Sequence, residues 1–464
     1  MQTASVYKEP SSFRDPSGFI FHRDGILYRQ IETSYQEHYD HLMVSGLYAA
    51  LQRERLLIPH TEASLDLAPQ PGGAYKVIQP ERLNFVSYPY EWGFSQLKDA
   101  ALITLQIQKK AVECGMVLKD ASAFNIQRHQ GRLLLIDTLS FEKYHEGDPW
   151  VAYRQFCQHF LAPLALMSRC DIRFGQLSRL YLDGIPLDLT AKLLPFRCRL
   201  NGGLLGHIYL HAGAQTKLAD KNLKPAAQYK VSRYSLLAII DHLESTVRGL
   251  CWKAGQTEWA DYYNATNYQG EAFRHKQECV SAYLDKINPK QVWDLGGNTG
   301  VFSRLASRRG IHTVCFDIDP SAVEINYLES IKHQELSLEA LILDLTNPSP
   351  ASGWAHRERA SFQERSAGVD LVLALALVHH LAISNNLPLE KIAEFFSRLG
   401  RALVIEFIPK PDSQVQRLLR TRKDIFPHYH EDGFEKAFGQ YFEILDKRPI
   451  VESHRSLYLM KPGR

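Results

Sequence analysis

The sequence lacks the cysteine pattern of a disulfide-stabilised or zinc-binding protein. Seven cysteines are spread over 464 residues, and no two of them are spaced as Cys-x-x-Cys. Disulfide frameworks and structural zinc sites use paired or clustered thiols, so neither is expected here. The pattern is more typical of a protein whose thiols stay reduced, as they do in the cytoplasm.

Long apolar runs and a strong excess of one charge are also missing. No uninterrupted apolar stretch approaches the ~20 residues of a membrane-spanning helix. The N-terminus has no basic segment followed by an apolar one, so a secretory signal is not expected. The net charge of +3 indicates neither nucleic acid nor an anionic membrane as an obligatory partner. We therefore expect a soluble, cytoplasmic protein with no membrane partner.

The sequence does contain enough apolar material for more than one domain. Its 464 residues are 45% hydrophobic and 23% charged, which is typical of a globular protein with two or three domains. Residues 213–230 have no clear periodicity and are predicted to form a long connection or a surface excursion. The next segment, Tyr234–Arg248, has the apolar spacing of an amphipathic helix. We place the domain boundary near residue 250, which predicts domains 1–250 and 251–464.

The second domain alternates short apolar runs with helical segments. Its predicted strands are Gln291–Leu295, Thr313–Phe316, Ala340–Leu343, Val369–Leu375 and Ala402–Ile408. Its predicted helices are Val301–Arg309, Ser321–Lys332 and Leu389–Leu399. This alternation favours an α/β fold in which helices cover both faces of a parallel sheet.

The first domain has a different rhythm. Two apolar runs flank Asp24-Gly25, a dipeptide typical of tight hairpin turns. Helical patterns follow at Tyr35–Arg55 and Ser95–Cys114. We therefore predict an α+β domain whose later part is mostly helical.

A glycine-rich loop, Asp-Leu-Gly-Gly-Asn-Thr-Gly, follows the first predicted strand at residues 294–300. Glycines let the backbone approach a ligand closely, and ligands of parallel sheets sit at the carboxyl ends of the strands. Asp317 ends the next strand and could accept hydrogen bonds from both hydroxyls of a ribose. Asp344 ends the third and could accept one from an adenine amine. The loop does not match the Gly-x-Gly-x-x-Gly of dinucleotide sites, so the main alternative is a turn that binds nothing.

Together these features resemble the class I S-adenosylmethionine-dependent methyltransferases. The family's Asp-x-Gly-x-Gly-x-Gly loop is matched at Asp294, Gly296 and Gly300. Asn298 replaces the middle glycine, and asparagine tolerates positive φ better than most residues. The resemblance implies a Rossmann-like seven-stranded sheet that ends in a hairpin of Tyr441–Lys447 and Ser456–Met460. It also implies S-adenosylmethionine as cofactor, bound by Asp294, Gly296, Gly297, Asn298, Gly300, Asp317, Ile318, Asp344 and Tyr268.

Tyr268 belongs to an aromatic group that precedes the predicted helix Glu271–Leu284. The other members are Trp259, Tyr262 and Tyr263. An aromatic face attracts cations, so these rings could cover the sulfonium of the cofactor. The alternative for each ring is packing between the domains.

Three residues are candidates for the methyl-acceptor side. His379 and His380 follow the fourth predicted strand, and an imidazole with a pKa near 6.5 could take a proton from the acceptor. The alternative is that one histidine caps the strand and the other packs against a helix. Glu406 lies in the fifth strand, where it could line the acceptor pocket or pair with a lysine or arginine. The basic and aromatic segment Arg420–His430 could cover this site or form a solvated surface.

A second signature occurs in the first domain at Asp120, Asn125 and Asp137. It resembles the catalytic segment of protein-kinase-like and aminoglycoside-phosphotransferase-like folds. In those families an aspartate accepts the substrate proton, and an asparagine and a second aspartate hold Mg²⁺ on the phosphates of ATP. The resemblance implies a kinase-like domain, with Phe85–Trp92 as the hinge between its lobes.

The first domain departs from that family in the region that would bind phosphate. It has neither a glycine-rich phosphate loop nor a Val-Ala-x-Lys strand, and Leu118-Lys119 replaces the usual residues before the aspartate. Arg29 is the nearest candidate for the phosphate-binding cation, and Glu37 for its partner on a helix. Arginine does not simply substitute for lysine at such a site.

Three functions remain open from the sequence. The first is a methyltransferase whose kinase-like domain binds the acceptor or a nucleotide. The second is a bifunctional enzyme that also transfers phosphate, and the third is a non-catalytic protein that binds S-adenosylmethionine. The two-part layout is similar to that of bacterial methyltransferases that include some linked to rhizobial nodulation. The acceptor, small molecule or macromolecule, is left open.

Overall fold

The computed structural model describes residues 6–212, 230–255, 270–420 and 422–463. The chain divides into two compact units. The first comprises Met1–Lys253 and Ser352–Arg359, and the second comprises Ala254–Ala351 and Ala360–Arg464. The sequence placed a boundary close to the first division but gave no sign that a short segment near residue 355 would be grouped with the first unit.

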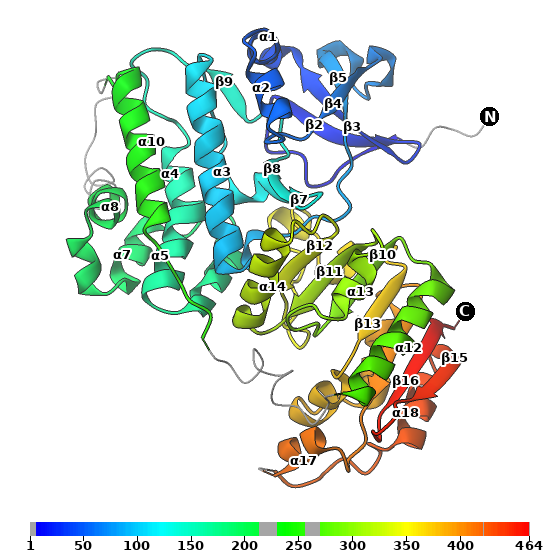
Figure 1. The fold of residues 1–464 in the computed structure, drawn as a ribbon. Helices are drawn as coiled ribbons and strands as arrows, with labels where there is room; N and C mark the ends of the chain where they lie inside the picture. The colour runs from blue at the N-terminus through cyan, green and yellow to red at the C-terminus, as the bar shows by residue number, and fades with distance from the viewer. Residues whose placement is uncertain (1–5, 213–229, 256–269, 421, 464) are drawn as a thin grey trace. The chain divides into compact units, whose positions relative to one another are not determined.

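The first unit begins with a five-stranded antiparallel sheet, drawn in blue in Figure 1. Its strands are β1 (Val6–Lys8), β2 (Gly18–Arg23), β3 (Ile26–Glu32), β4 (His60–Ala63) and β5 (Ala74–Pro80), in the order β1-β2-β3-β5-β4. The predicted hairpin is confirmed, because β2 pairs with β3 from Gly18 opposite Ile31 to Arg23 opposite Ile26. Asp24 and Gly25 both have positive φ, 53° and 80°, as a tight turn between twisted strands requires.

The helix predicted over Tyr35–Arg55 is wrong as a single element. The structure has α1 (Gln36–Val44) and α2 (Leu47–Arg53) instead. Gly46 separates them with a φ of 83°, a left-handed conformation that ends an α-helix. The apolar periodicity continues through both helices, so it gave no sign of the break.

The long helix predicted over Ser95–Cys114 is present as α3 (Phe94–Glu113). Two short antiparallel pairs follow it, β6 (Met116–Leu118) with β9 (Phe141–Lys143) and β7 (Ile126–His129) with β8 (Arg132–Leu135). The later helices include α4 (Tyr153–Phe156), α5 (Ala162–Arg169), α6 (Leu177–Leu180), α7 (Leu187–Leu193), α8 (Gly202–Leu204) and α10 (Arg233–Arg248). Helix α10 packs against α3 and confirms the predicted amphipathic helix; the connection predicted before it lies, apart from Lys230, outside the described residues.

The first unit consists of an antiparallel sheet followed by a mainly helical region, and a hairpin lies between the candidate residues Asn125 and Asp137. This is the layout of a kinase-like α+β domain. The fold predicted for the first unit is therefore present. Hairpin β7–β8 separates Asn125 from Asp137, as the resemblance implied.

The second unit is built on a seven-stranded sheet. Its strands are β10 (Gln291–Leu295), β11 (His312–Asp317), β12 (Leu338–Ile342), β13 (Leu371–Ala374), β14 (Leu403–Phe407), β15 (Phe442–Pro449) and β16 (Ser456–Pro462). Their order is β12-β11-β10-β13-β14-β16-β15. The first five in this order run parallel, and β16 is antiparallel to both of its neighbours. This confirms the Rossmann-like methyltransferase sheet with its C-terminal hairpin.

Helices cover both faces of this sheet, as Figure 1 shows. On one face Val292, Leu373 and Val404 belong to a buried cluster with residues of α12 (Glu271–Ile287) and α13 (Ser303–Ser307). On the other, Trp293 packs against Phe362 at a ring distance of 5.0 Å. The other helices are α14 (Pro320–Lys332), α15 (Phe362–Arg365), α16 (Leu389–Ser397), α17 (Ser413–Leu419) and α18 (Glu431–Phe438). None of the helices in the described ranges is long and apolar enough to cross a membrane.

Candidate cofactor-binding and acceptor site

The glycine-rich loop follows the carboxyl end of β10, and three of its residues have a left-handed backbone conformation. The φ angles of Gly296, Asn298 and Gly300 are 75°, 52° and 80°. Asparagine tolerates positive φ better than most residues, so it fits this middle position. At Gly297 a Cβ atom would lie 2.5 Å from the Cys315 sulfur and 2.8 Å from the Asp294 carboxyl, so only glycine fits there.

Two buried carboxylates border this loop. Asp317 accepts hydrogen bonds from the backbone N–H of Asn298 at 2.8 Å and of Asp319 at 2.9 Å, which ties the loop to the end of β11. Asp294 accepts a hydrogen bond from the Ser303 hydroxyl at 2.6 Å. Its other oxygen, Oδ1, is buried and has no hydrogen-bond partner among the described residues. Burial raises the pKa of both carboxyls to about 6.

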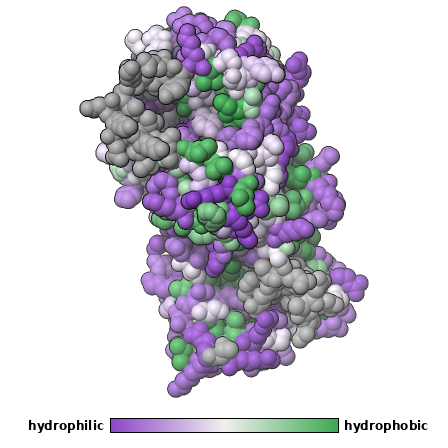
Figure 2. All heavy atoms as spheres, turned by 90° about the vertical axis from the view of Figure 1, so that its left-hand side faces the viewer, coloured by the Kyte–Doolittle hydropathy of each residue, from purple (hydrophilic) through white to green (hydrophobic). Residues whose placement is uncertain are grey.

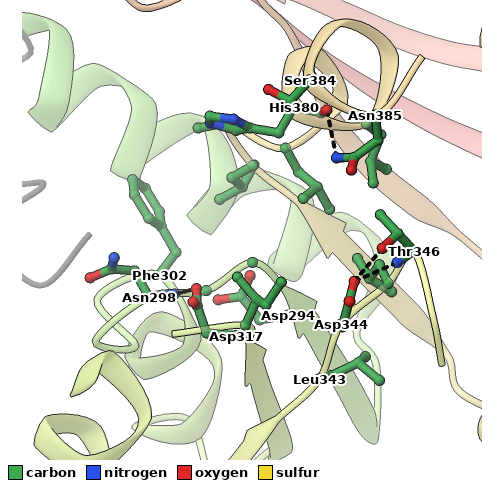
Figure 3. A pocket seen from close by; sticks show the side chains of 18 of the residues that line it. Asp294, Asn298, Phe302, Asp317, Leu343, Asp344, Thr346, His380, Ser384 and Asn385 are labelled. Atoms are coloured by element: carbon green, nitrogen blue, oxygen red, sulfur yellow. Dashed lines mark hydrogen bonds between the residues drawn. The ribbon is translucent and has the colours of Figure 1, made fainter. Parts of the chain in front are cut away.

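The loop forms one wall of a pocket of about 310 Å³. Figure 3 shows Asp294, Asp317 and Asp344 on the loop side and His380, Ser384 and Asn385 across from them. Other lining residues are Phe273, Lys276, Gly296, Gly297, Asn298, Phe302, Ile318, Leu343, Leu345, Thr346, Leu375, Ala376, Leu377, Leu381 and Arg455. All of them belong to the second unit.

The structure thus brings most of the predicted cofactor residues to one pocket. Gly300 lies in the loop but does not line the pocket. Asp344 follows β12, and its Oδ1 accepts hydrogen bonds from the backbone N–H and the hydroxyl of Thr346, at 2.8 and 2.6 Å. Tyr268 lies outside the described residues, as do the other aromatic candidates, Trp259, Tyr262 and Tyr263.

The two histidines occupy different environments although their rings are 4.0 Å apart. His380 lines the pocket, and burial lowers its pKa to about 4, so the ring is neutral at pH 7. His379 is fully buried and does not line the pocket. Neither of its ring nitrogens has a hydrogen-bond partner among the described residues. Only His380 is placed where it could reach an acceptor in the pocket.

Glu406 is fully buried on β14 and is not among the residues that line the pocket. Its Oε2 accepts hydrogen bonds from the Lys276 ammonium at 2.6 Å and the backbone N–H of Ala376 at 2.7 Å. The Arg455 guanidinium lies 3.5 Å from its Oε1. The sequence left open whether Glu406 lines the acceptor pocket or pairs with a lysine or arginine. In the structure it pairs with cations.

The basic segment Arg420–His430 contacts the acceptor side without lining the pocket. Arg422 donates hydrogen bonds to the backbone oxygen of Ile383 and to the side chain of Asn386. These two residues flank Ser384 and Asn385, which do line it.

Several lining residues were not anticipated from the sequence. Phe302 lies just after the glycine-rich loop, at the start of α13. Phe273, Ser384, Asn385 and Arg455 carry no local motif and come from other parts of the second unit. Arg455 had one faint signal, a cation just before the last apolar strand. Its partner Asp412 lies far from it in the sequence, so their bond could not be found by spacing.

The kinase-like residues of the first unit also lie near one another. Asp120 accepts hydrogen bonds from the Ser122 backbone at 2.9 Å and the Gln155 amide at 2.8 Å. Burial and then the nearby charge of Asp137 raise its pKa, while a hydrogen bond from Asn125 lowers it.

Arg29, the candidate for the phosphate-binding cation, lies next to Asp137, and its guanidinium forms an ion pair with that carboxylate. The prediction that Glu37 pairs with Arg29 is wrong. Glu37 faces solvent and pairs with Lys143 at 2.5 Å. Arg29 instead lies 3.4 Å from Asp15, on the connection between β1 and β2. The acidic partner of Arg29 thus comes from the β1–β2 connection and not from the helix that carries Glu37.

Comparison with known proteins gives one extensive match. No protein-family model matches the chain. The nodulation protein NoeA of Rhizobium meliloti (strain 1021) is 34% identical over 453 residues, which cover 96% of this chain and 94% of the relative.

Two solved structures give weaker likenesses. The bifunctional kinase-methyltransferase WbdD is 15% identical, covers 46% of this chain and 45% of its own, and has a TM-score of 0.29. Magnesium protoporphyrin IX methyltransferase (ChlM) from Synechocystis PCC 6803 is 19% identical, covers 44% of this chain and 98% of its own, and has a TM-score of 0.30. The fold assignment rests on the strand order rather than on these scores. The match to NoeA spans both units, and the chain belongs to the same family as the nodulation protein NoeA.

Proposed function

We propose that the second unit is an S-adenosylmethionine-dependent methyltransferase. The observation that carries this proposal is the pair of buried carboxylates, Asp294 and Asp317, at a tight glycine loop that opens on a pocket of about 310 Å³. A pocket of that size at the carboxyl ends of parallel strands suits a nucleoside-sized ligand.

The residues present fit the charges and shape of this cofactor. The Asp294 oxygen without a hydrogen-bond partner could accept from the cofactor's ammonium group. Asp317 and Asp344 follow neighbouring strands, where they could bind the ribose hydroxyls and the adenine amine. Bound there, S-adenosylmethionine supplies an electrophilic methyl group on a sulfonium. The chain itself orients the two reactants and holds a proton acceptor.

His380 is the residue we assign to proton removal from the acceptor. It lines the pocket on the side opposite the acids, and its lowered pKa keeps it neutral and able to accept a proton. The name of the NoeA relative suggests searching among compounds that bacteria make during nodulation.

Binding can be tested by titration calorimetry with S-adenosylmethionine, and with NAD⁺ as a nucleotide control. We expect binding of the first alone, lost in Asp317→Ala. The matched control is Asp285→Ala on α12, whose exposed carboxylate pairs with Arg309 and does not line the pocket. Absence of binding to the wild-type protein would overturn the proposal.

Catalysis is tested separately with methyl-labelled cofactor and a bacterial extract. Transfer of label to an extract component, reduced in His380→Ala, supports the enzyme. A protein that binds the cofactor tightly but labels nothing supports the alternative of non-catalytic binding.

A second candidate function is phosphoryl transfer by the first unit. The grouping of Asp120, Asn125 and Asp137 favours it. The ion pair between Arg29 and Asp137 argues against it, because Mg²⁺ would have to displace the guanidinium. Magnesium-dependent ATP binding that is lost in Asp137→Ala would support this candidate. Its absence would support a degenerate kinase-like unit that does not transfer phosphate.

A further inference from the structure

The carboxylate of Glu406 is the centre of a buried cluster of charges. Lys276 from α12 and Arg455 from the turn before β16 both reach it. Arg455 is held in turn by Asp412, with hydrogen bonds of 2.7 and 3.2 Å. The side chains of Lys276, Glu406 and Arg455 expose 5%, 0% and 4% of their surface, so the two cations and the carboxylate are almost fully removed from water. Such charges persist in a fold only when they are paired, which makes this cluster rigid.

The Glu406 carboxylate also binds the backbone. Ala376 donates its N–H to Oε2 at 2.7 Å. It has a φ of 50°, a left-handed conformation that is unfavourable for a residue with a Cβ atom. Backbone strain of this kind is kept only where the surroundings hold it, and a charge-assisted hydrogen bond is a strong restraint.

Ala376 lies at the start of the acceptor wall, which we define as residues 375–385. The pocket-lining members of this wall are Leu375, Ala376, Leu377, His380, Leu381, Ser384 and Asn385. Leu377 packs against the cofactor loop, since its Cδ1 is 3.3 Å from where a Cβ of Gly296 would lie. The turn at Ala376 therefore sets the spacing between the cofactor loop and His380.

We propose that Glu406 is a positioning residue, whose buried carboxylate fixes the left-handed turn at Ala376 and so sets the distance between the methyl donor and the acceptor wall. This inference rests on the proposed methyltransferase function. Lys276 and Arg455 hold the carboxylate in place, and Ala376 transmits its position to the wall. Glu406 itself touches neither reactant.

Hydrogen exchange of the wall tests the restraint without any ligand. Glu406→Asp keeps the charge but shortens the side chain by one methylene, so it loses its reach to Ala376. We expect amide exchange in peptides covering residues 374–382 to be about tenfold faster in this variant, as the loss of one charge-assisted hydrogen bond predicts. The control is Glu339→Asp, the same change at a buried glutamate of β12 that does not line the pocket. Unchanged exchange in Glu406→Asp would overturn the proposal.

A double-mutant cycle with Ala376→Gly tests the role of the strain. Glycine adopts positive φ without the Cβ penalty, so the turn no longer needs the restraint. We expect Glu406→Asp to weaken binding of S-adenosylhomocysteine about tenfold in the wild-type background but clearly less in the Ala376→Gly background. Equal losses in both backgrounds would show that Glu406 does not act through the turn at Ala376 and would overturn the positioning role.

These measurements separate the two proposals. If the wild-type protein binds no S-adenosylhomocysteine, the proposed function fails, and the exchange experiment still decides whether Glu406 restrains the wall. If the wild-type protein binds it but Glu406→Asp changes neither exchange nor affinity, the positioning role fails and the proposed function stands.

Discussion

At the scale of single residues, the two carboxyls of the cofactor loop predict how ligand binding depends on pH. Burial raises the pKa of Asp294 and of Asp317 to about 6. The ammonium group and the ribose hydroxyls of the cofactor both need an ionised carboxylate as acceptor. S-adenosylmethionine should therefore bind about tenfold more weakly at pH 5 than at pH 7 for each carboxyl required. Calorimetry across this range measures the effect, and Asp317→Asn should make the dependence shallower. An affinity that is constant from pH 7 to pH 5 would contradict this assignment.

Without ligand, the free energy of unfolding should depend on pH in the opposite sense to ligand binding, because Asp294 and Asp317 stabilise the fold more when they are protonated. Their pKa in the folded protein lies above the unfolded value of 3.8, so the folded state binds protons more tightly. Their contribution is fully present below about pH 4 and is lost as the pH rises through about 6. From pH 4 to pH 7 the wild-type protein should lose this contribution, whereas Asp317→Asn should not. In urea unfolding, the free energy of unfolding of the variant should therefore rise relative to that of the wild type over this range. A difference that stays constant over this range would be evidence against the raised pKa.

Asn298 makes a second residue-scale prediction. It has a φ of 52°, and its side chain accepts a hydrogen bond from the Thr299 N–H at 2.8 Å. Asn298→Ala should lower the free energy of unfolding by about 1–2 kcal/mol, because alanine has no local hydrogen bond to offset the left-handed backbone. Asn298→Gly should cost less, since glycine removes the backbone penalty. Urea unfolding of both variants measures the difference, and an alanine variant as stable as the glycine variant would refute the explanation.

At the scale of elements, α12 and β14 are joined by the buried pair of Lys276 and Glu406. Lys276→Met should destabilise the protein by about 3–5 kcal/mol, because it leaves a buried carboxylate with one cation fewer. The matched control is Lys391→Met on α16, which breaks an exposed pair with Glu394 and should leave the unfolding midpoint unchanged. Denaturant unfolding followed by circular dichroism compares them, and a loss no larger than that of the control would contradict a structural role for the pair.

Most elements of the second unit could be predicted from periodicity, but their ends could not. The predicted strand Val369–Leu375 is shorter in the structure because Val369 and Leu375 lie outside the ladder of β13. The predicted helix Val301–Arg309 is reduced to Ser303–Ser307. An apolar pattern reports which face is buried, whereas hydrogen bonds decide where an element stops. The break between α1 and α2 at Gly46 has the same cause.

At the scale of the whole molecule, all residues that line the pocket belong to the second unit. A ligand that binds the folded unit stabilises it by mass action, by about 2.7 kcal/mol at a concentration of 100 times the Kd. We therefore expect S-adenosylhomocysteine to raise the unfolding temperature of the second unit in scanning calorimetry. NAD⁺ at the same concentration is the control and should raise no transition. A ligand-induced rise that survives Asp317→Ala would place the binding site elsewhere.

The sequence by itself determined the two fold types, and it predicted which residues would gather around the glycine-rich loop. Asp294, Asp317 and Asp344 lie at or just beyond the carboxyl ends of successive strands of a parallel sheet. Such strands end at one edge, so the order of these residues along the chain was enough. The position after the fourth predicted strand made His379 and His380 candidates together, and the resemblance to kinase-like folds gave Asp120, Asn125 and Asp137.

Only the tertiary structure decided which charges pair. Glu406 meets Lys276 and Arg455, and Arg29 meets Asp137 and Asp15 rather than Glu37. These partners come from elements far apart in the chain, and no local spacing encodes them. Burial then decides the pairing, because a charged group removed from water is stable only next to an opposite charge, and the packing determines which one is near.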